Sequence, residues 1–162
     1  MLILGIDPGL HLTGYGLVTL KRGQLALQEA GVLRMKVKGD LATRLKELDD
    51  HVSELIKESA PARIAVEQLY AHYKHPRTAI LMGHARGVIL LAAARQEIPV
   101  TNLASTMVKK SITGNGHAKK SQIQRTIASL CKLKTVPEPP DVADAIAIAW
   151  TLAMHLNRGI ST

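Results

Sequence analysis

The chain has 162 residues, 46% of them hydrophobic, which is enough for one globular domain with a sizeable core and excludes a disordered tail. The formal net charge of +8 favours a polyanionic partner, either nucleic acid or an anionic membrane surface. The single cysteine, Cys131, excludes an intramolecular disulfide and a four-cysteine zinc site.

Membrane spans and export signals are not expected from the sequence. The longest uninterrupted apolar stretch, Val88 to Ala94, is bounded by Arg86 and Arg95 and is too short to cross a bilayer. The apolar start of the chain reaches Asp7 too soon for a signal peptide. We therefore expect a cytoplasmic protein that folds as one domain over residues 1–162.

The first predicted element is a buried strand that ends in an acid. Leu2 to Ile6 is apolar, and Asp7 follows it before Pro8 and Gly9 turn the chain. Open α/β sheets bind ligands at the carboxyl ends of their strands, so Asp7 is a candidate metal or phosphate residue. The alternative is a turn aspartate that caps the Pro-Gly bend, which is the more common role of an isolated Asp-Pro-Gly.

Two further strands and a helix are predicted next. Strand-forming residues from Leu12 to Leu20 and from Leu25 to Met35 flank a turn at residues 21–24, which indicates an antiparallel meander. From Asp40 to Ser59 the apolar residues recur at helical spacing, and Asp40 is a suitable N-cap.

A second acid-terminated strand precedes a loop and a long helix. Ala62 to Glu67 is a short apolar strand that repeats the pattern of the first one. The polar, histidine-rich segment from Tyr70 to His75 predicts a loop, and Pro76 suits the first turn of a helix that extends to about Gln96. That helix is apolar or small on nearly every face, and Gly83 and Gly87 allow another helix to approach. We expect a subunit interface here, and burial within one subunit is an equally good alternative.

The last third of the chain is first basic and then apolar. We expect a strand at Ile98 to Leu103, a helix at Ala104 to Thr113, a basic helix at His117 to Leu133 and, after a proline-rich break, an apolar helix at Asp141 to Leu156. Alternation of short strands and helices predicts an α/β fold.

Four carboxylates lie at the ends of apolar elements. Asp7 and Glu67 end strands, and Asp141 and Asp144 open the last helix on one face. Packing of that helix against the sheet would bring the four together, and clustered carboxylates repel one another unless a cation neutralises them. Hard oxygen ligands suit Mg²⁺ or Mn²⁺. Each acid alone has an ordinary interpretation, as a helix-start or strand-end surface residue; together they favour a metal site.

These acids belong to a set of motifs that follow one another along most of the chain. The motifs are Gly5-Ile6-Asp7-Pro8-Gly9 with Thr13-Gly14-Tyr15-Gly16, Val66-Glu67-Gln68, Gly83-His84-Ala85-Arg86-Gly87, Lys120-Ser121-Gln122-Ile123-Gln124, and the run from Asp141 to Ala149. The set resembles the RuvC-type Holliday-junction resolvases from Leu2 to about His155. Two positions depart from the common pattern of that family: Tyr70 stands where relatives often carry Phe, and His84 where others often have Gln.

The resemblance implies a ribonuclease-H-like fold, a mixed sheet flanked by helices, and a homodimer. It implies structure-selective cutting of four-way DNA junctions during recombination and repair, with a branch-migration helicase complex of the RuvA and RuvB type as partner. It also implies that the four acids bind metal, for which we expect two Mg²⁺ ions per subunit, with Mn²⁺ as a substitute. Two-metal hydrolysis would leave 5′-phosphate ends.

Basic and aromatic residues supply the candidates for contact with DNA. Lys109 and Lys120 align with family lysines near the active site, and Lys120 is expected to stabilise transition-state charge. Tyr70 is expected to stack on an unpaired base. Phosphate contacts are expected from four more residues: Lys74, Arg77, Lys119 and Arg125. For Lys110 and Lys119, an ordinary solvated lysine is a better interpretation than a role in catalysis.

Three other functions were weighed against the resolvase. An actin-like ATPase fragment shares the first motif, but it requires a duplicated domain and an adenosine loop, for which the chain is too short. A non-catalytic junction- or RNA-binding module of the same fold is disfavoured because all four acids are present. A YqgF-type nuclease acting on RNA is disfavoured more weakly, by the acidic pair and the basic helix.

Overall fold

Residues 1–36, 39–69 and 76–159 are described by the computed structural model. Their strands form one five-stranded sheet in the order β3-β2-β1-β4-β5. The strands are β1 (Leu2–Asp7), β2 (Leu12–Lys21), β3 (Gln24–Arg34), β4 (Arg63–Glu67) and β5 (Val100–Leu103). The first three form the predicted antiparallel meander, and β4 and β5 continue the sheet parallel to β1. The predicted mixed α/β sheet is therefore confirmed.

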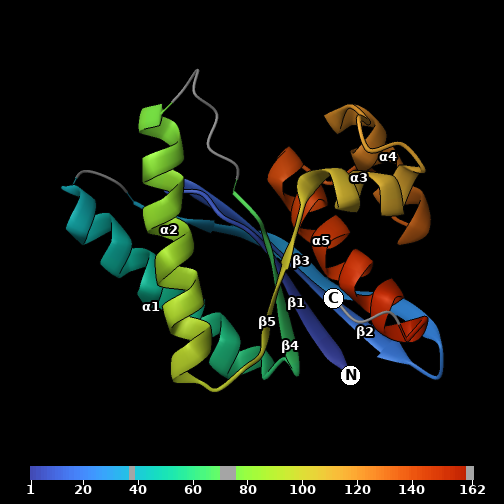
Figure 1. The fold of residues 1–162 in the computed structure, drawn as a ribbon, viewed down its shortest axis with the longest axis horizontal. Coiled ribbons are helices and arrows are strands. Elements are labelled where there is room, and N and C mark those ends of the chain that lie inside the picture. Colours follow the sequence, from blue (N-terminus) through green and yellow to red (C-terminus); the bar gives the residue numbers. More distant parts are fainter. Residues whose placement is uncertain (37–38, 70–75, 160–162) are drawn as a thin grey trace.

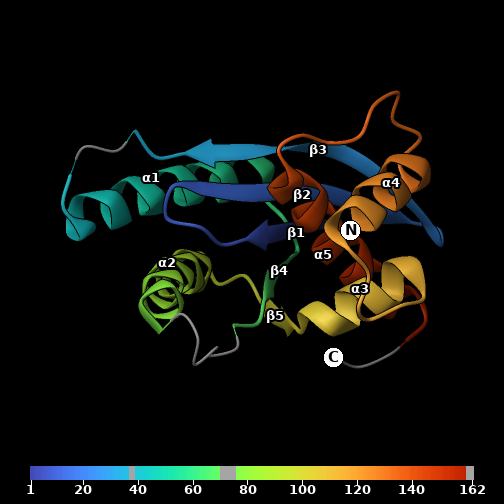
Figure 2. The same ribbon diagram turned by 90° about the horizontal axis from the view of Figure 1, so that it is seen from above.

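Helices cover both faces of this sheet. They are α1 (Leu41–Ser59), α2 (Pro76–Arg95), α3 (Ser105–Thr113), α4 (Lys120–Leu130) and α5 (Pro140–Asn157). Figures 1 and 2 show α1 and α2 on one side of the sheet and α3, α4 and α5 on the other. Each side has its own cluster of buried aliphatic residues, so the sheet separates two cores.

Side chains along β1 alternate between the two cores, as the pleat of a strand requires. Ile3 belongs to the core beneath α5, whereas Leu4 and Ile6 belong to the core beneath α1 and α2. Continuing the alternation, Asp7 at the end of β1 falls on the α5 face. The strand thus delivers its acid to the side of the sheet where the last helix lies.

The neighbouring strand β4 follows the same rule. Ala65 belongs to the α5 core, and Ile64 and Val66 belong to the opposite one, so Glu67 also falls on the α5 face. In the parallel pairing of the two strands, Ile6 lies beside Val66. The next residue of each strand is its acid, which places Asp7 and Glu67 side by side.

Two glycines of the sheet, which have no side chain, let the backbone of α5 lie directly on the sheet. A Cβ atom at Gly5 in β1 would collide with the backbone of Ala145, and one at Gly14 in β2 would collide with the backbone of Asp141. Gly14 is also the residue of β2 that pairs with Asp7. The contact at Gly14 therefore sets the start of α5 next to the end of β1.

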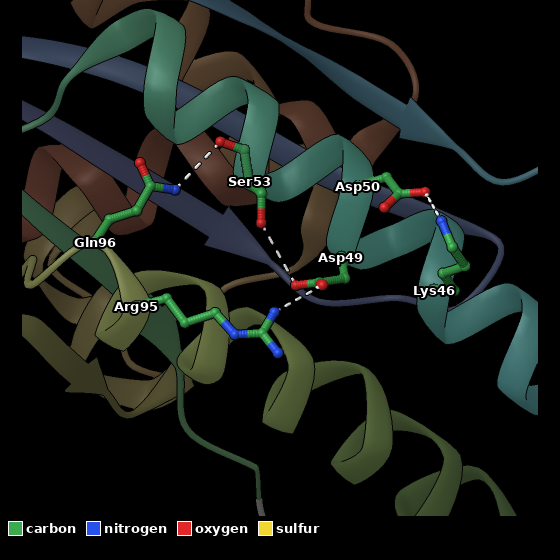
Figure 3. Close-up of polar contacts among 6 residues, drawn as sticks. All are labelled: Lys46, Asp49, Asp50, Ser53, Arg95 and Gln96. Atoms are coloured by element: carbon green, nitrogen blue, oxygen red, sulfur yellow. Dashed lines mark hydrogen bonds and ion pairs between the residues drawn. The ribbon is translucent and has the colours of Figure 1, made fainter.

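The helices α1 and α2, on the face of the sheet opposite α5, are joined by polar contacts near the end of α2. Arg95 forms an ion pair with Asp49 of α1 over 2.9 Å, and the side chain of Gln96 donates a hydrogen bond to the backbone carbonyl of Ser53 (Figure 3). At the start of α1, Asp40 accepts a hydrogen bond from the backbone of Thr43, which confirms the predicted N-cap.

One helix is shorter than predicted, and the other elements begin and end within two residues of the predicted positions. The sequence predicted a helix from His117 to Leu133. The side chain of Asn115 instead accepts a hydrogen bond from the backbone of His117 and forms a turn ahead of the helix. Lys119 has an extended backbone, and Lys132 has a left-handed one with φ of 54°. The helix is therefore confined to residues between these two lysines.

The apolar helix α2 is only partly buried. Its buried residues are Ala85, Ile89, Ala92 and Ala93. Ile80 and Leu91 are 63% and 49% exposed. By length and composition alone, α2 as a whole helix is apolar enough to cross a membrane, although its uninterrupted apolar run is short. Arg86 lies in its middle, however, and a charge at the centre of a bilayer is costly. The exposed apolar residues of α2 therefore lie on a helix with a charge at its centre.

The contact between α5 and β1 predicts a strong effect of one methyl group at Gly5. The substitution Gly5→Ala should lower the free energy of unfolding by about 2 kcal/mol or more, because the new methyl group overlaps fixed backbone atoms. Urea denaturation measures the loss. The matched control is Gly87→Ala in α2, where a Cβ meets nothing within 4 Å. If Gly5→Ala were as stable as the control, close packing of α5 on β1 would be wrong.

Candidate active site

A pocket of about 280 Å³ opens where β1 and β4 end beneath the start of α5. Its lining contains all four carboxylates predicted to act together: Asp7, Glu67, Asp141 and Asp144. Two come from strand ends, and two come from the first turns of the helix that the glycines hold against the sheet. The structure therefore brings together the acids that the sequence singled out.

Two of the predicted lysines complete the polar part of the pocket. Lys109 of α3 and Lys120 of α4 both line it. The Nζ atom of Lys120 lies 3.3 Å from a carboxylate oxygen of Asp144. Burial alone would lower the pKa of Lys120, but the nearby carboxylates, Asp144 first among them, raise it above its ordinary value. Lys120 is therefore held as a cation at the edge of the acidic cluster.

The acids in the pocket are poorly solvated and repel one another. Burial raises the pKa of Asp7 well above its usual value, and the charges of Glu67, Asp144 and Asp141 raise it further. Burial also raises the pKa of Glu67 and of Asp144. Lys120 acts in the opposite direction on Asp7 and Asp144. Negative charge in the pocket is thus costly unless a cation balances it.

Glu67 has protein hydrogen bonds on both its backbone and its side chain. The Ser105 hydroxyl bonds to the carboxylate and partly offsets the rise in its pKa. The backbone carbonyl accepts a hydrogen bond of 3.2 Å from Nε of Arg86 in α2. Sequence reasoning gave neither residue a role in the site, although Arg86 belongs to one of the quoted motifs. Ser105 comes two residues after the end of a parallel strand, β5, and could have been found by the rule that located Asp7.

The rest of the lining is apolar and was not predicted as part of the site. It comes from the turn after β1 and from α2, α3, α4 and α5: Pro8, Met82, Val108, Ile123 and Ile148. Apolar walls reduce the number of water molecules that can solvate the acids. They lower the effective dielectric constant, so each charge in the pocket interacts more strongly with a bound cation or phosphate.

The donor set fits hard divalent cations. Four carboxylates supply oxygen ligands of the kind that Mg²⁺ and Mn²⁺ prefer. A bound cation would offset both the burial and the mutual repulsion that raise the pKa of Asp7, Glu67 and Asp144. Within the described residues, no three His, Cys, Asp or Glu side chains are already close enough to form a cluster around one ion. Ion binding would therefore have to draw the carboxylates closer together.

The other candidates for DNA contact lie outside the pocket lining. Arg77, Lys119 and Arg125 are exposed, at the start of α2, just before α4 and on α4. Tyr70 and Lys74 lie outside the described residues. The structure thus groups Lys109 and Lys120 with the acids and leaves three other basic residues on the surface.

The raised pKa of Asp7 predicts that neutralising this residue stabilises the metal-free protein. Above the ordinary pKa of an aspartate, ionisation favours the unfolded chain, and the penalty is relieved as the pH falls through the raised folded-state pKa. At neutral pH with EDTA, Asp7→Asn should therefore raise the free energy of unfolding.

Urea denaturation at neutral pH and at about pH 4 tests this prediction, because the gain should shrink at the lower pH. Asp50→Asn serves as the control, since Asp50 is a surface acid paired with Lys46. A loss of stability in Asp7→Asn at neutral pH would contradict the assigned cost of the buried charge.

Comparison with known proteins gives a consistent match over nearly the whole chain. The family model described as "Crossover junction endodeoxyribonuclease RuvC" matches residues 3–152. The chain is 52% identical to the protein of that name from Rhodopirellula baltica, with 91% of this chain and 83% of the relative covered. It is 41% identical to the one from Pelotomaculum thermopropionicum, with 96% and 94% covered.

Solved structures agree with the sequence matches. The RuvC structure from Thermus thermophilus has a TM-score of 0.87 and 30% identity, covering 98% of this chain and 97% of that one. The same organism's RuvC in complex with a Holliday junction substrate has a TM-score of 0.89 and 31% identity, covering 98% and 96%. The fold, the order of the motifs and these matches lead to one assignment: the chain belongs to the RuvC family of crossover junction endodeoxyribonucleases.

Proposed function

We propose that this chain is a metal-dependent endonuclease that resolves Holliday junctions by paired nicks in opposed DNA strands, during recombination and repair. The observation that carries the proposal is the pocket in which four carboxylates and two lysines meet at the ends of β1 and β4. Membership of the RuvC family supports it, because a relative with 31% identity has been solved with a Holliday junction substrate. The charge of +8 suits a DNA ligand.

The four acids would hold the metal in this proposal. Asp7 and Glu67 would bind from the sheet, and Asp141 and Asp144 from α5. We expect two Mg²⁺ ions per subunit, with Mn²⁺ as a substitute. Held by these acids, divalent ions would activate a water molecule and stabilise the charge on the leaving 3′ oxygen, and the products would then carry 5′-phosphate ends.

The lysines of the pocket have a separate role in the proposal. Lys120 lies beside Asp144 and remains a cation, so it can contact a phosphate oxygen and stabilise the charge that develops there. Lys109 contributes a second positive charge from α3. The apolar walls of the pocket limit competing solvation and strengthen both interactions. No nucleophilic side chain is required, so Cys131 and the serines have no covalent role.

We propose that basic residues on the protein surface contact the rest of the junction. Arg77, Lys119 and Arg125 lie on or beside the elements that border the pocket, where they can bind phosphates and add affinity rather than sequence preference. Lys74 is proposed for the same role and Tyr70 for stacking on an unpaired base, as the sequence suggested. A branch-migration helicase complex of the RuvA and RuvB type is the expected partner, and the cytoplasm the expected location.

The proposal includes a homodimer. A four-way junction has approximate two-fold symmetry, so a two-fold dimer would present one active site to each of two opposed strands. The exposed apolar residues of α2 support an interface on this helix. Around Gly83 and Gly87 the space that a Cβ would occupy is open, which allows another helix to approach closely.

Cleavage of a synthetic mobile four-way junction tests the proposed function. With Mg²⁺ the chain should place paired nicks in the junction and leave linear duplex and RNA–DNA hybrid uncut, and EDTA should stop cleavage. Asp7→Asn should slow cleavage by about three orders of magnitude, because the metal supplies several kcal/mol of transition-state stabilisation. Junction binding should persist. Binding without cleavage under any divalent metal would indicate a non-catalytic module. Cleavage of the RNA–DNA hybrid instead of the junction would show that the proposed substrate is wrong.

The position of Lys120 predicts a defect in the chemical step. Lys120→Met should reduce the single-turnover cleavage rate by about 100-fold, as for loss of one preorganised charge, with a small change in junction affinity. Lys110→Met is the matched control, because Lys110 is an exposed lysine of α3 that does not line the pocket. Equal rates in the two variants would remove Lys120 from the mechanism.

The α2 interface predicts that a charge on its exposed face weakens subunit association. Ile80→Asp or Gly83→Asp should shift the sedimentation coefficient towards a monomer and reduce paired cutting in favour of single nicks. Met107→Asp is the control, since Met107 is also an exposed apolar residue but belongs to α3. An unchanged sedimentation coefficient for both α2 variants would place the interface elsewhere.

A further inference from the structure

The backbone at the end of β4 is held by a side chain from the helix layer. Beyond Glu67 the strand ends, and the last backbone bond to β5 runs from Gln68 to the carbonyl of Leu103. The carbonyl of Glu67 accepts its hydrogen bond from Nε of Arg86, at 3.2 Å. The same guanidinium group donates from Nη2 to the side chain of Asn102 on β5. One arginine of α2 therefore bridges the ends of two adjacent parallel strands.

We propose that Arg86 is a positioning residue for metal binding, which fixes the backbone of Glu67 and makes the placement of α2 a determinant of the active site. This inference rests on the proposed function, because it assumes that Glu67 is a metal ligand. Arg86 itself is not part of the pocket lining, so it acts through Glu67 rather than on the substrate.

The geometry of the guanidinium group suits this role. Its nitrogen atoms are fixed in one plane, so two donors can reach two acceptors at a set separation. A lysine at the same place would present a single ammonium group and could not reproduce the fork. The carboxylate of Glu67 is bonded by the Ser105 hydroxyl, so this residue is restrained at both ends. Without the hydrogen bond from Arg86 to the Glu67 carbonyl, the end of β4 that carries the Glu67 carboxylate would be less restrained.

Another residue of α2 gives the arrangement a second connection to the pocket. Met82 lies one turn before Arg86 on the same helix and forms part of the pocket wall. A shift of α2 would therefore move Met82 and the Arg86 bond to Glu67 together. The helix α2, which carries the exposed apolar residues, thus contacts Glu67, a proposed metal ligand.

The same helix offers a matched control. Arg95 also belongs to α2 and also bonds to another element, but its partner is Asp49 of α1 (Figure 3). Loss of Arg95 removes an arginine contact from α2 without touching β4 or β5. Substitution of Arg86 or of Arg95 should loosen the packing of α2. Only the substitution of Arg86 should also affect the metal site.

Binding of Mn²⁺ to the DNA-free protein, followed by the electron paramagnetic resonance signal of free Mn²⁺, tests the proposal. Arg86→Met should weaken Mn²⁺ binding by about tenfold or more, as for loss of other residues that support metal ligands, and Arg95→Met should leave it unchanged. Arg86→Lys and Asn102→Ala should show smaller losses in the same direction. In cleavage assays, Arg86→Met should need a higher Mg²⁺ concentration for half-maximal rate, with unchanged sedimentation and junction binding.

The outcomes separate this inference from the proposed function. If the wild-type chain binds Mn²⁺ and cuts junctions, and Arg86→Met binds Mn²⁺ as tightly as the wild type, the positioning role is wrong and the function stands. If Arg86→Met does not fold, Arg86→Lys and Asn102→Ala decide, and unchanged Mn²⁺ affinity in both overturns the role. If the wild type neither binds Mn²⁺ nor cuts junctions, the proposed function itself fails.

Discussion

The backbone contact between α5 and the glycines of β1 and β2 is the constraint on which the site depends. Gly5 and Gly14 leave no side chain between the helix and the sheet, so the first turns of α5 settle beside the end of β1. Two acids from the helix then meet two acids from the strands. With an ordinary side chain at either glycine, the helix would have to stand off, and the carboxylates would separate.

This packing gathers like charges in a place that is unfavourable for them. Burial and mutual repulsion raise the pKa of Asp7, Glu67 and Asp144, so at neutral pH the acids oppose folding of the metal-free protein. Burial of aliphatic side chains in the cores on the two faces of the sheet offsets this destabilisation. A chain selected for stability alone would not keep four acids here, whereas a metal-dependent nuclease requires them.

Much of this arrangement could be predicted from the sequence, because it follows from rules that act along the chain. Apolar runs that end in Asp7 and Glu67 identify strand ends, and the period of the side chains places both acids on one face. What could not be predicted depends on contacts between distant residues. The bond from Arg86 to the carbonyl of Glu67 has no local signature, since the motif that contains Arg86 does not indicate which group its side chain contacts. The late start of α4 likewise follows from a turn built by Asn115, which competes with an otherwise helical pattern.

The most direct test of the account is anomalous X-ray scattering from crystals of the protein equilibrated with Mn²⁺. The account predicts two peaks about 4 Å apart, bounded by Asp7, Glu67, Asp141 and Asp144. It predicts that the peaks weaken or vanish in Asp7→Asn, while the fold stays the same. Strong peaks elsewhere, with none among the four carboxylates, would contradict the claim that α5 and the sheet together build a metal centre.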